Sequence, residues 1–365
     1  MFRRKAWLAA RPAGRRAQFD IVSIMTRSLT SIISASVVLA AASVTAGGSF
    51  QRAIAAPLQD PYGTWTLQGE NDAVSTQKGT SDQYYTSGLR IGWTSGTDNQ
   101  PPAISNLNRA IWGEGMQRIS LGLQQSIFTP RGTQLNPPNP QDRPYAGVLL
   151  ATANLISDTE LSRSVFGVQA GVLGSYAGGY QVQNGFHSLI SDTPNRGWSH
   201  QLPNQPILQL QASRIWRFPV ISAYGISVDL LPTVAAAGGD FRTYAQAGGT
   251  IRIGQGLDSD FGTARISPGL DGTDAFKGTR TLAWYGFAGA DGQAVLYDAT
   301  LQGSTFRSGE PHVSKIWDVG EFEAGLAVIY HGVRLSYTQV WQTPEFNGQR
   351  SGLFNFGSLA LSAKF

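Results

Sequence analysis

Apolar and polar residues alternate along most of the chain after residue 60. From residue 321 onward, acidic and small residues occupy one set of positions, and the intervening positions hold Phe322, Ala324, Leu326, Val328 and Tyr330. Alternation with a period of two is typical of a β-strand with one apolar and one polar face. Because Glu321 and Glu323 share the second face, we expect that face to meet water. The chain is therefore predicted to be all-β.

The pattern repeats often enough to predict about twelve antiparallel strands. They are expected at residues 63–70, 84–96, 116–128, 145–157, 163–176, 206–217, 222–238, 242–256, 281–292, 319–330, 332–342 and 355–365. An even number of strands can close into a barrel, in which each strand satisfies its backbone hydrogen bonds through its neighbours. Residues 183–190 break the alternation and are predicted to form a short helix in a loop.

Alternation alone does not distinguish a soluble sandwich from a transmembrane barrel. Aromatic residues flank the strands, as the girdles of membrane barrels require; they include Trp93, Trp216, Trp284, Tyr285, Tyr330, Tyr337 and Trp341. The last residue, Phe365, closes an amphipathic strand, which is similar to the terminal signal by which bacterial outer-membrane proteins are recognised for assembly. We expect a barrel in the outer membrane of a Gram-negative bacterium, with that assembly machinery as a partner.

Residues 1–55 are predicted to be an N-terminal extension followed by a secretory signal peptide. A basic segment, an apolar stretch from Leu29 to Ala46 and small residues at 53–56 follow in the order typical of such a signal, with Met25 as an alternative start. A single membrane anchor is the alternative, although the apolar run is short for a span. Residues 56–365 would then form one barrel domain.

Removing this leader reverses the charge balance. Residues 1–55 hold 8 of the 28 Lys and Arg and 1 of the 24 Asp and Glu, which leaves 20 basic against 23 acidic side chains and a net charge of −3. The basic pI of the whole chain therefore does not indicate nucleic-acid binding. The chain has no cysteine, so packing and backbone pairing rather than disulfides must stabilise it.

Strand parity predicts which connections lie together. If the first strand runs outward from the periplasm, connections after odd-numbered strands lie outside, and the long polar segments 71–83, 129–144 and 177–205 all follow odd strands. They are predicted to gather at the outer rim. Segments 97–115 and 257–280 are also long but fall on the periplasmic side, so either the count is wrong by a pair of strands or these turns carry additional structure.

Two of the outer segments contain polar groups that could carry chemistry. Asn71 and Asp72 precede a strand that includes Thr86, and an amide, a carboxylate and a hydroxyl are hard oxygen ligands suited to calcium. An ordinary turn is the alternative, because Asn and Asp favour turns for conformational reasons. Arg143 could form an ion pair with Asp142 or face a phosphate as a planar fork.

His187 lies in the segment that interrupts the alternation. A histidine with one ring nitrogen held by a carboxylate or carbonyl can take a proton from water near neutral pH, and Asp192 and Asn184 are candidates to orient it. A solvated loop histidine is the alternative, and His200 competes for the same role. The sequence has no Cys nucleophile, Gly-x-Ser-x-Gly elbow, phosphate-binding loop or zinc-spaced His pair.

Five strings of residues carry a resemblance to a known family. They are Asn71-Asp72, Tyr85-Thr86-x-Gly88-Leu89, Asp142-Arg143-Pro144-Tyr145-Ala146-Gly147, Gln183-Asn184-x-x-His187 and Gly197-Trp198-x-x-Gln201-Leu202. Their order resembles that of the outer-membrane lipid A 3′-O-deacylase family over nearly all of the exported chain. The resemblance implies a twelve-stranded outer-membrane barrel with a calcium-dependent active site between the barrel wall and a short helix near the outer rim.

The resemblance also implies roles for individual residues. His187 falls on the catalytic histidine, as general base on a water, and Asn71 and Asp72 fall on the paired amide and carboxylate of the site, with Asp72 as a calcium ligand. Thr86 falls on the hydroxyl that completes the cluster. Calcium would hold the developing oxyanion, lipid A in the lipopolysaccharide of the outer leaflet would be the substrate, and the apolar outer wall would accommodate the acyl chain.

One departure from the family pattern lies close to the histidine. Thr193 stands where the family has a glutamate. Asp192, Gln183 and Asn184 are the candidate accessory residues around it.

A second departure concerns lipid A phosphates. The family's basic pair ahead of the Asp-Arg string is absent, and Arg131 is the only basic residue in the loop before Asp142. Arg131 and Arg143 are therefore the candidates for a phosphate. A monomer is expected, and a non-catalytic barrel or a pore on the same scaffold are the alternative functions.

Overall fold

The computed structural model describes residues 60–74, 81–267 and 274–365. All of them belong to one compact unit, Ile54–Phe365. The predicted leader at residues 1–55 lies outside the described residues.

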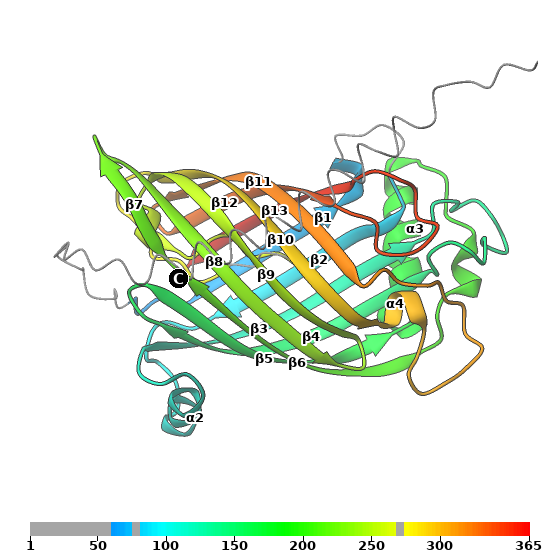
Figure 1. The fold of residues 1–365 in the computed structure, drawn as a ribbon, viewed down its shortest axis with the longest axis horizontal. Coiled ribbons are helices and arrows are strands. Elements are labelled where there is room, and N and C mark those ends of the chain that lie inside the picture. The colour runs from blue at the N-terminus through cyan, green and yellow to red at the C-terminus, as the bar shows by residue number, and fades with distance from the viewer. Residues whose placement is uncertain (1–59, 75–80, 268–273) are drawn as a thin grey trace, which may run out of the picture. The chain divides into compact units, whose positions relative to one another are not determined.

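The described chain is built almost entirely of antiparallel strands (Figure 1). The strands are β1 (Thr64–Asn71), β2 (Tyr84–Thr94), β3 (Met116–Thr129), β4 (Ala146–Asp158), β5 (Ser162–Leu173), β6 (Gln205–Trp216), β7 (Phe218–Ala223), β8 (Ile226–Gly239), β9 (Arg242–Gln255), β10 (Ala283–Asp298), β11 (Asp318–Tyr330), β12 (Val333–Gln342) and β13 (Phe354–Lys364).

Helical segments are short and lie in the connections. They are η1 (Asp72–Val74), α2 (Pro102–Trp112), η2 (Ser175–Ala177), α3 (Gly179–Ile190), η3 (Gly197–His200), η4 (Leu257–Ser259) and α4 (Ala299–Gln302). Among the described residues no helix is long and apolar enough to cross a membrane.

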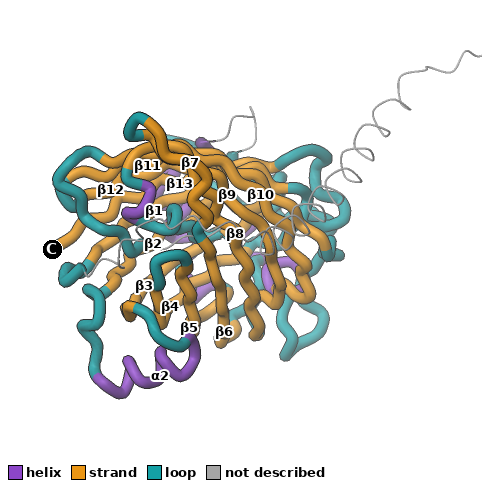
Figure 2. Tube along the Cα trace, turned by 60° about the vertical axis from the view of Figure 1, so that its left-hand side comes forward, coloured by secondary structure: helices purple, strands orange, loops and turns teal. Residues whose placement is uncertain are grey.

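The sheet closes into a barrel (Figure 2). β1 pairs with β13 along its whole length, and β6 pairs with β8 over Gln209–Ile215. β7 follows β6 after Arg217 and pairs with the beginning of β8, so β6 and β7 share one position in the barrel. The 13 strands of the sheet therefore occupy twelve positions, which confirms the predicted closed antiparallel barrel.

One predicted strand boundary is wrong. Residues 218–221 were expected to form a turn between strands at 206–217 and 222–238, but the chain stays extended there and turns at Tyr224 and Gly225, both with positive φ. Pro219 broke the alternation and is a typical turn signal. In the structure it lies beside a register irregularity in β7, where a bulge tolerates proline.

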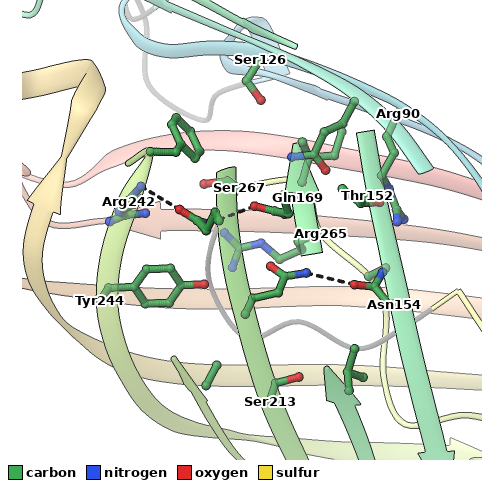
Figure 3. Close-up of a pocket in the computed structure, with 18 of the residues that line it drawn as sticks. Arg90, Ser126, Thr152, Asn154, Gln169, Ser213, Arg242, Tyr244, Arg265 and Ser267 are labelled. Carbon is green, nitrogen blue, oxygen red and sulfur yellow. Dashed lines mark hydrogen bonds between the residues drawn. The ribbon is translucent and has the colours of Figure 1, made fainter. Parts of the chain in front are cut away.

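The two faces of the sheet differ as the alternation predicted. Outward side chains are apolar and exposed; they include Leu67, Leu89, Leu121, Leu123, Leu208, Leu210, Ile251, Ile253, Leu326, Leu335, Leu359 and Leu361. Inward side chains are polar and buried, and they line a chamber of about 150 Å³ that includes Asn154, Gln169, Arg242 and Arg265 (Figure 3). This is the distribution expected when lipid surrounds the barrel and polar groups pair inside it.

The long connection after β9 accounts for one of the two segments that did not fit strand parity. Residues 257–267 and 274–282, here called the lumen segment, fold back into the barrel. Arg265 pairs with Glu321 at 3.0 Å and with Glu323 at 3.5 Å on the inner face of β11. Asp274 pairs with Arg90 of β2 at 2.6 Å. The other long connection contains α2, so the strand count was right and both turns carry additional structure.

Strand direction also gathers the connections as predicted. The connections after β1, β3 and β5 lie at one end of the barrel, here called the α3 end, and α2 lies at the other, here called the α2 end (Figure 1). Candidate chemistry from three distant parts of the sequence therefore meets at the α3 end.

The ion pairs of the lumen segment predict a stability effect. Replacing Arg265→Ala leaves Glu321 and Glu323 buried without their counter-charge, and breaking a buried pair in this way costs about 3–5 kcal/mol. The free energy of unfolding, measured by urea titration of the folded barrel in detergent, should fall by that order. Arg307→Ala is the matched control, because Arg307 is 47% exposed and its pair with Glu310 contributes about 0–1 kcal/mol. Equal losses in the two variants would contradict the role given to the lumen segment.

Candidate active site

The helix α3 packs against the outside of the barrel wall at the α3 end. It begins after Gly178, which has a positive φ of 72°, and its start lies tightly on β4: a Cβ on Gly147 would lie 3.1 Å from the Gly179 nitrogen. The Gln125 amide of β3 donates to the Ala177 carbonyl at 2.6 Å. Close approach thus explains the glycine that ends the Asp-Arg-Pro-Tyr-Ala-Gly string.

His187 lies on the inner side of this helix and is 5% exposed. Its Nδ1 lies 2.8 Å from the Thr193 carbonyl oxygen, and its Nε2 lies 3.1 Å from Asp82 Oδ2. A carbonyl can only accept, so Nδ1 carries a proton. In the neutral imidazole Nε2 is then an unprotonated acceptor, and it becomes a donor to Asp82 once it takes up a proton.

The Thr193 carbonyl holds one ring nitrogen of His187, which is one of the two kinds of group expected there. Asn184 holds the loop that carries it, because Asn184 Oδ1 accepts from the Asn195 N–H at 2.8 Å and its Nδ2 donates to the Asn195 carbonyl at 3.0 Å. The Asp192 carboxylate is turned to the backbone N–H of Thr193 at 2.6 Å. Asp192 and Asn184, the predicted orienting groups, therefore act on the loop backbone rather than on the imidazole.

Gln183 lies one helical turn before His187 and fixes the carboxylate that faces it. Its Nε2 donates to Asp82 Oδ1 at 2.8 Å, and its Oε1 accepts from Trp198 Nε1 at 2.9 Å. Trp198 packs on Tyr145 with ring centroids 4.9 Å apart. Three of the strings noted in the sequence thus meet here through hydrogen bonds and ring packing.

Asp82 is the site residue that the sequence did not single out. It belongs to the loop before β2, and both Asp82 and Tyr84 have positive φ, 55° and 62°. Left-handed backbone is tolerated by Asp but is uncommon for a bulky residue such as Tyr. This local geometry turns the Asp82 side chain towards α3, and no pattern in the sequence reveals it.

Asp72 lies next to Asp82 and is almost completely buried. Its exposed fraction is 1%, and its Oδ2 accepts from the Gln83 N–H at 2.8 Å. Burial raises the pKa of the Asp72 carboxyl well above its usual range, the Gln83 hydrogen bond opposes this, and the Asp82 charge raises it further. No ion pair between described residues includes Asp72.

Thr86 and Asn71 complete the predicted cluster in different ways. The Thr129 hydroxyl donates its proton to the Asp82 carbonyl at 2.9 Å. In the 2.7 Å contact between the Thr129 and Thr86 hydroxyls, Thr86 is therefore the donor, and the Thr86 oxygen keeps its lone pairs. Asn71 is half-buried, and its Oδ1 accepts from the Ala73 N–H at 2.7 Å. Asn71 therefore caps the turn that presents Asp72.

These groups fit a hard cation. Asp72 is a buried carboxylate with a second carboxylate beside it, and Thr86 offers hydroxyl lone pairs, which is the oxygen-only chemistry that calcium prefers. In the part of the chain that the structure describes, no group of three or more His, Asp or Glu forms a complete metal cluster. A bound ion would therefore complete its shell with backbone, water or substrate oxygens.

The two candidate phosphate ligands are not brought together. Arg143 is buried, and it pairs with Glu345 at 2.5 Å and with the Thr300 hydroxyl rather than with Asp142, so the expected pairing was wrong. Arg131 is exposed at the rim, with its backbone N–H on Asp142. His200, the competitor of His187, is exposed and contacts Asn136 at 3.0 Å.

A family model described as "Outer membrane protein LpxR" matches residues 29–365. The chain belongs to this family. Among solved structures, LpxR from Salmonella typhimurium aligns with a TM-score of 0.69 and 22% identity, over 83% of this chain and 100% of that chain. The β domain of the Bordetella autotransporter BrkA aligns with a TM-score of 0.41 and 9% identity, over 84% and 100% of the two chains. No curated protein sequence matches the chain.

Membership of the LpxR family confirms the resemblance noted from the five strings. The LpxR family consists of lipid A 3′-O-deacylases, so the chain is a carboxylic ester hydrolase of the outer membrane with lipid A as its substrate. The barrel fold agrees with that location.

The Thr193 contact predicts a contrast between two neighbouring substitutions. Thr193→Ala keeps the backbone carbonyl, so lipid A deacylation should stay close to that of the wild type. Asn184→Ala removes two hydrogen bonds from the loop that carries this carbonyl, and at about 0.5–1.5 kcal/mol each the rate should fall roughly tenfold. Mass spectrometry of lipid A over a time course measures both. A large loss in Thr193→Ala would show that the side chain carries the role.

Proposed function

We propose that this LpxR-family chain hydrolyses the 3′-linked acyl ester of lipid A with His187 as general base and calcium as cofactor. The observation that carries the proposal is the pair of contacts made by the buried imidazole: Nδ1 on the Thr193 carbonyl and Nε2 facing Asp82, beside the buried carboxylate of Asp72. A buried carboxyl with a raised pKa that lies beside a second carboxylate and an imidazole is typical of a catalytic site.

The proton is handled at Nε2 of His187. With Nδ1–H held by the Thr193 carbonyl, Nε2 accepts a proton from water as the water oxygen attacks the ester carbonyl. Asp82, 3.1 Å away, stabilises the imidazolium that forms. The same proton then passes to the leaving 3′-oxygen of the sugar, so the ester bond breaks and the neutral imidazole is restored.

Asp72 and Thr86 are the side chains that would hold calcium, with Asp82 beside them. When bound, the ion supplies positive charge that polarises the ester carbonyl and offsets the oxyanion. Without a cation, burial favours the protonated form of Asp72. Gln183 donates to Asp82 Oδ1 and so keeps Asp82 Oδ2 directed at the imidazole.

An apolar groove on the outer wall supports an acyl-chain substrate. It has a volume of about 590 Å³, and Leu67, Leu89, Leu123, Leu149 and Leu359 line it around Gly69. Gln125 also lines this groove, and the same side chain holds Ala177 just before α3. A hydrocarbon chain in the groove would therefore lie against the wall that supports the histidine-bearing helix.

The pore alternative has no comparable support. The lumen segment lies inside the barrel, with Arg265 fully buried between β11 and the other inner-face residues.

Removing the base predicts a large loss of turnover. His187→Ala should lower deacylation about 10²–10⁴-fold, the usual contribution of a general base. Lipid A extracted from cells that express each variant is compared by mass spectrometry, with barrel folding checked by gel mobility without heating. His200→Ala is the control and should act like the wild type. Full activity in the His187→Ala barrel would refute its role.

Removing a calcium ligand predicts a shift in metal dependence rather than a uniform loss. In Asp72→Asn the calcium concentration that gives half-maximal activity should rise by at least about tenfold, and excess calcium should restore part of the rate. Asp318→Asn, which alters an exposed carboxylate at the same end of the barrel, is the matched control. An unchanged calcium titration in Asp72→Asn would count against this ligand assignment.

A further inference from the structure

The helix α2 presents an apolar face that is largely exposed. Ala103, Ile104, Leu107, Ala110 and Ile111 recur at the spacing that places side chains on one side of an α-helix. Leu107 is 53% exposed and Ile111 is 38% exposed. Nothing in catalysis at the opposite end of the barrel uses this face.

The other sides of α2 differ in character. Ser105 and Arg109 lie opposite the apolar face, and Asn106 lies at its edge. Between the two faces, Asn108 is buried, and its Nδ2 donates to the Ile156 carbonyl of β4 at 2.9 Å. One buried hydrogen bond therefore fixes the helix to the edge of the barrel wall, and most of the apolar face stays exposed.

The position of α2 places the helix beside the lipid-facing wall. Both views draw the helix beside the ends of β3, β4 and β5, outside the ring of strands (Figures 1 and 2). The nearby outer surface is also apolar: Leu121 of β3 is 52% exposed, and Leu161 in the turn between β4 and β5 is 45% exposed.

We propose that α2 is an interfacial helix, with its apolar face in the acyl chains of the membrane leaflet at the α2 end and Asn106 and Arg109 in the headgroup layer. Its occupant is a phospholipid surface. A second copy of the chain fits less well, because two alanines and three larger side chains bury far less than the roughly 800 Å² per partner of a stable interface. The assignment of this leaflet as the periplasmic one rests on the proposed function, because lipid A occupies the opposite leaflet. The contact of α2 with lipid does not depend on that function.

Such a helix sets the depth of the barrel in the membrane. The wall alone can slide along the bilayer normal at modest cost, whereas a helix lying in the interface is held at one level. Because α2 is joined to β4 by the Asn108 contact, the catalytic rim at the far end of the same strands is held at a fixed height relative to the ester.

The absence of cysteine makes a direct test possible. Leu107→Cys and Arg109→Cys each introduce a unique thiol on opposite sides of α2, and each is labelled with an environment-sensitive fluorophore. The labelled barrels are placed in phospholipid nanodiscs that hold one barrel each, and circular dichroism confirms folding. Quenching is measured with nitroxide-labelled phospholipids and, separately, with an aqueous quencher that reaches both faces of a disc.

We expect the label at 107 to emit at shorter wavelength, to be quenched several-fold more by lipid nitroxides than the label at 109, and to be protected from the aqueous quencher. Equal access of both labels to water would overturn the proposal, and a periplasmic protein partner would give this result. Protection at 107 that appears only in discs with two barrels would overturn it in favour of a second copy. None of these readings depends on deacylation, so failure of the enzyme assignment would leave the test intact.

Discussion

Every other feature of this protein depends on one constraint, the pairing of all strand backbone groups inside a medium that cannot hydrogen-bond to them. The pairing of β1 with β13 and of β6 with β8 closes the sheet, so the barrel has no open strand edge. In the closed sheet neighbouring strands run in opposite directions, so the connections after β1, β3 and β5 lie at the same end. This closure brings together Asp72 and Asp82, the Asp-Arg-Pro-Tyr-Ala-Gly string and the helix α3 that carries His187.

The wall that carries the site is supported on both of its sides. Inside the barrel, Glu70 accepts from the Ile266 N–H at 2.8 Å, the Ser267 N–H at 3.0 Å and the Tyr85 hydroxyl at 2.7 Å. Glu70 lies two residues before Asp72. Outside, α3 packs on the same wall and brings His187 to Asp82. The lumen segment and α3 therefore hold opposite faces of strands that end in the site, which restricts the freedom of the groups that must act together.

Much of this arrangement could be predicted from the sequence because it follows from periodicity. Alternation located nearly all the strands, and it failed at Pro219, where a bulge rather than a turn accommodates the residue. The lumen segment could not be foreseen, since polar residues that pair inside a barrel look the same as those of a solvated loop. Family membership, shown by the match over residues 29–365, agrees with the five strings.

The site was predicted less completely, for two physical reasons. Asp82 and Gln183 are far apart in sequence and meet only through the packing of α3 on β3 and β4. The group that orients His187 is a backbone carbonyl, and every residue has one, so the side chain at 193 gives no sign of it. Thr193, which stands where the family has a glutamate, contributes its backbone carbonyl as the acceptor for His187 Nδ1.

The most direct test of the account is the protonation state of the two His187 nitrogens. Nitrogen-15 NMR of the histidine-labelled barrel in micelles, with the signal assigned by its loss in His187→Gln, reports which nitrogen carries the proton in the neutral ring. The account predicts that the neutral ring carries its proton on Nδ1 and none on Nε2. A neutral ring with the proton on Nε2 would contradict it, because the nitrogen facing Asp82 could not then act as the base.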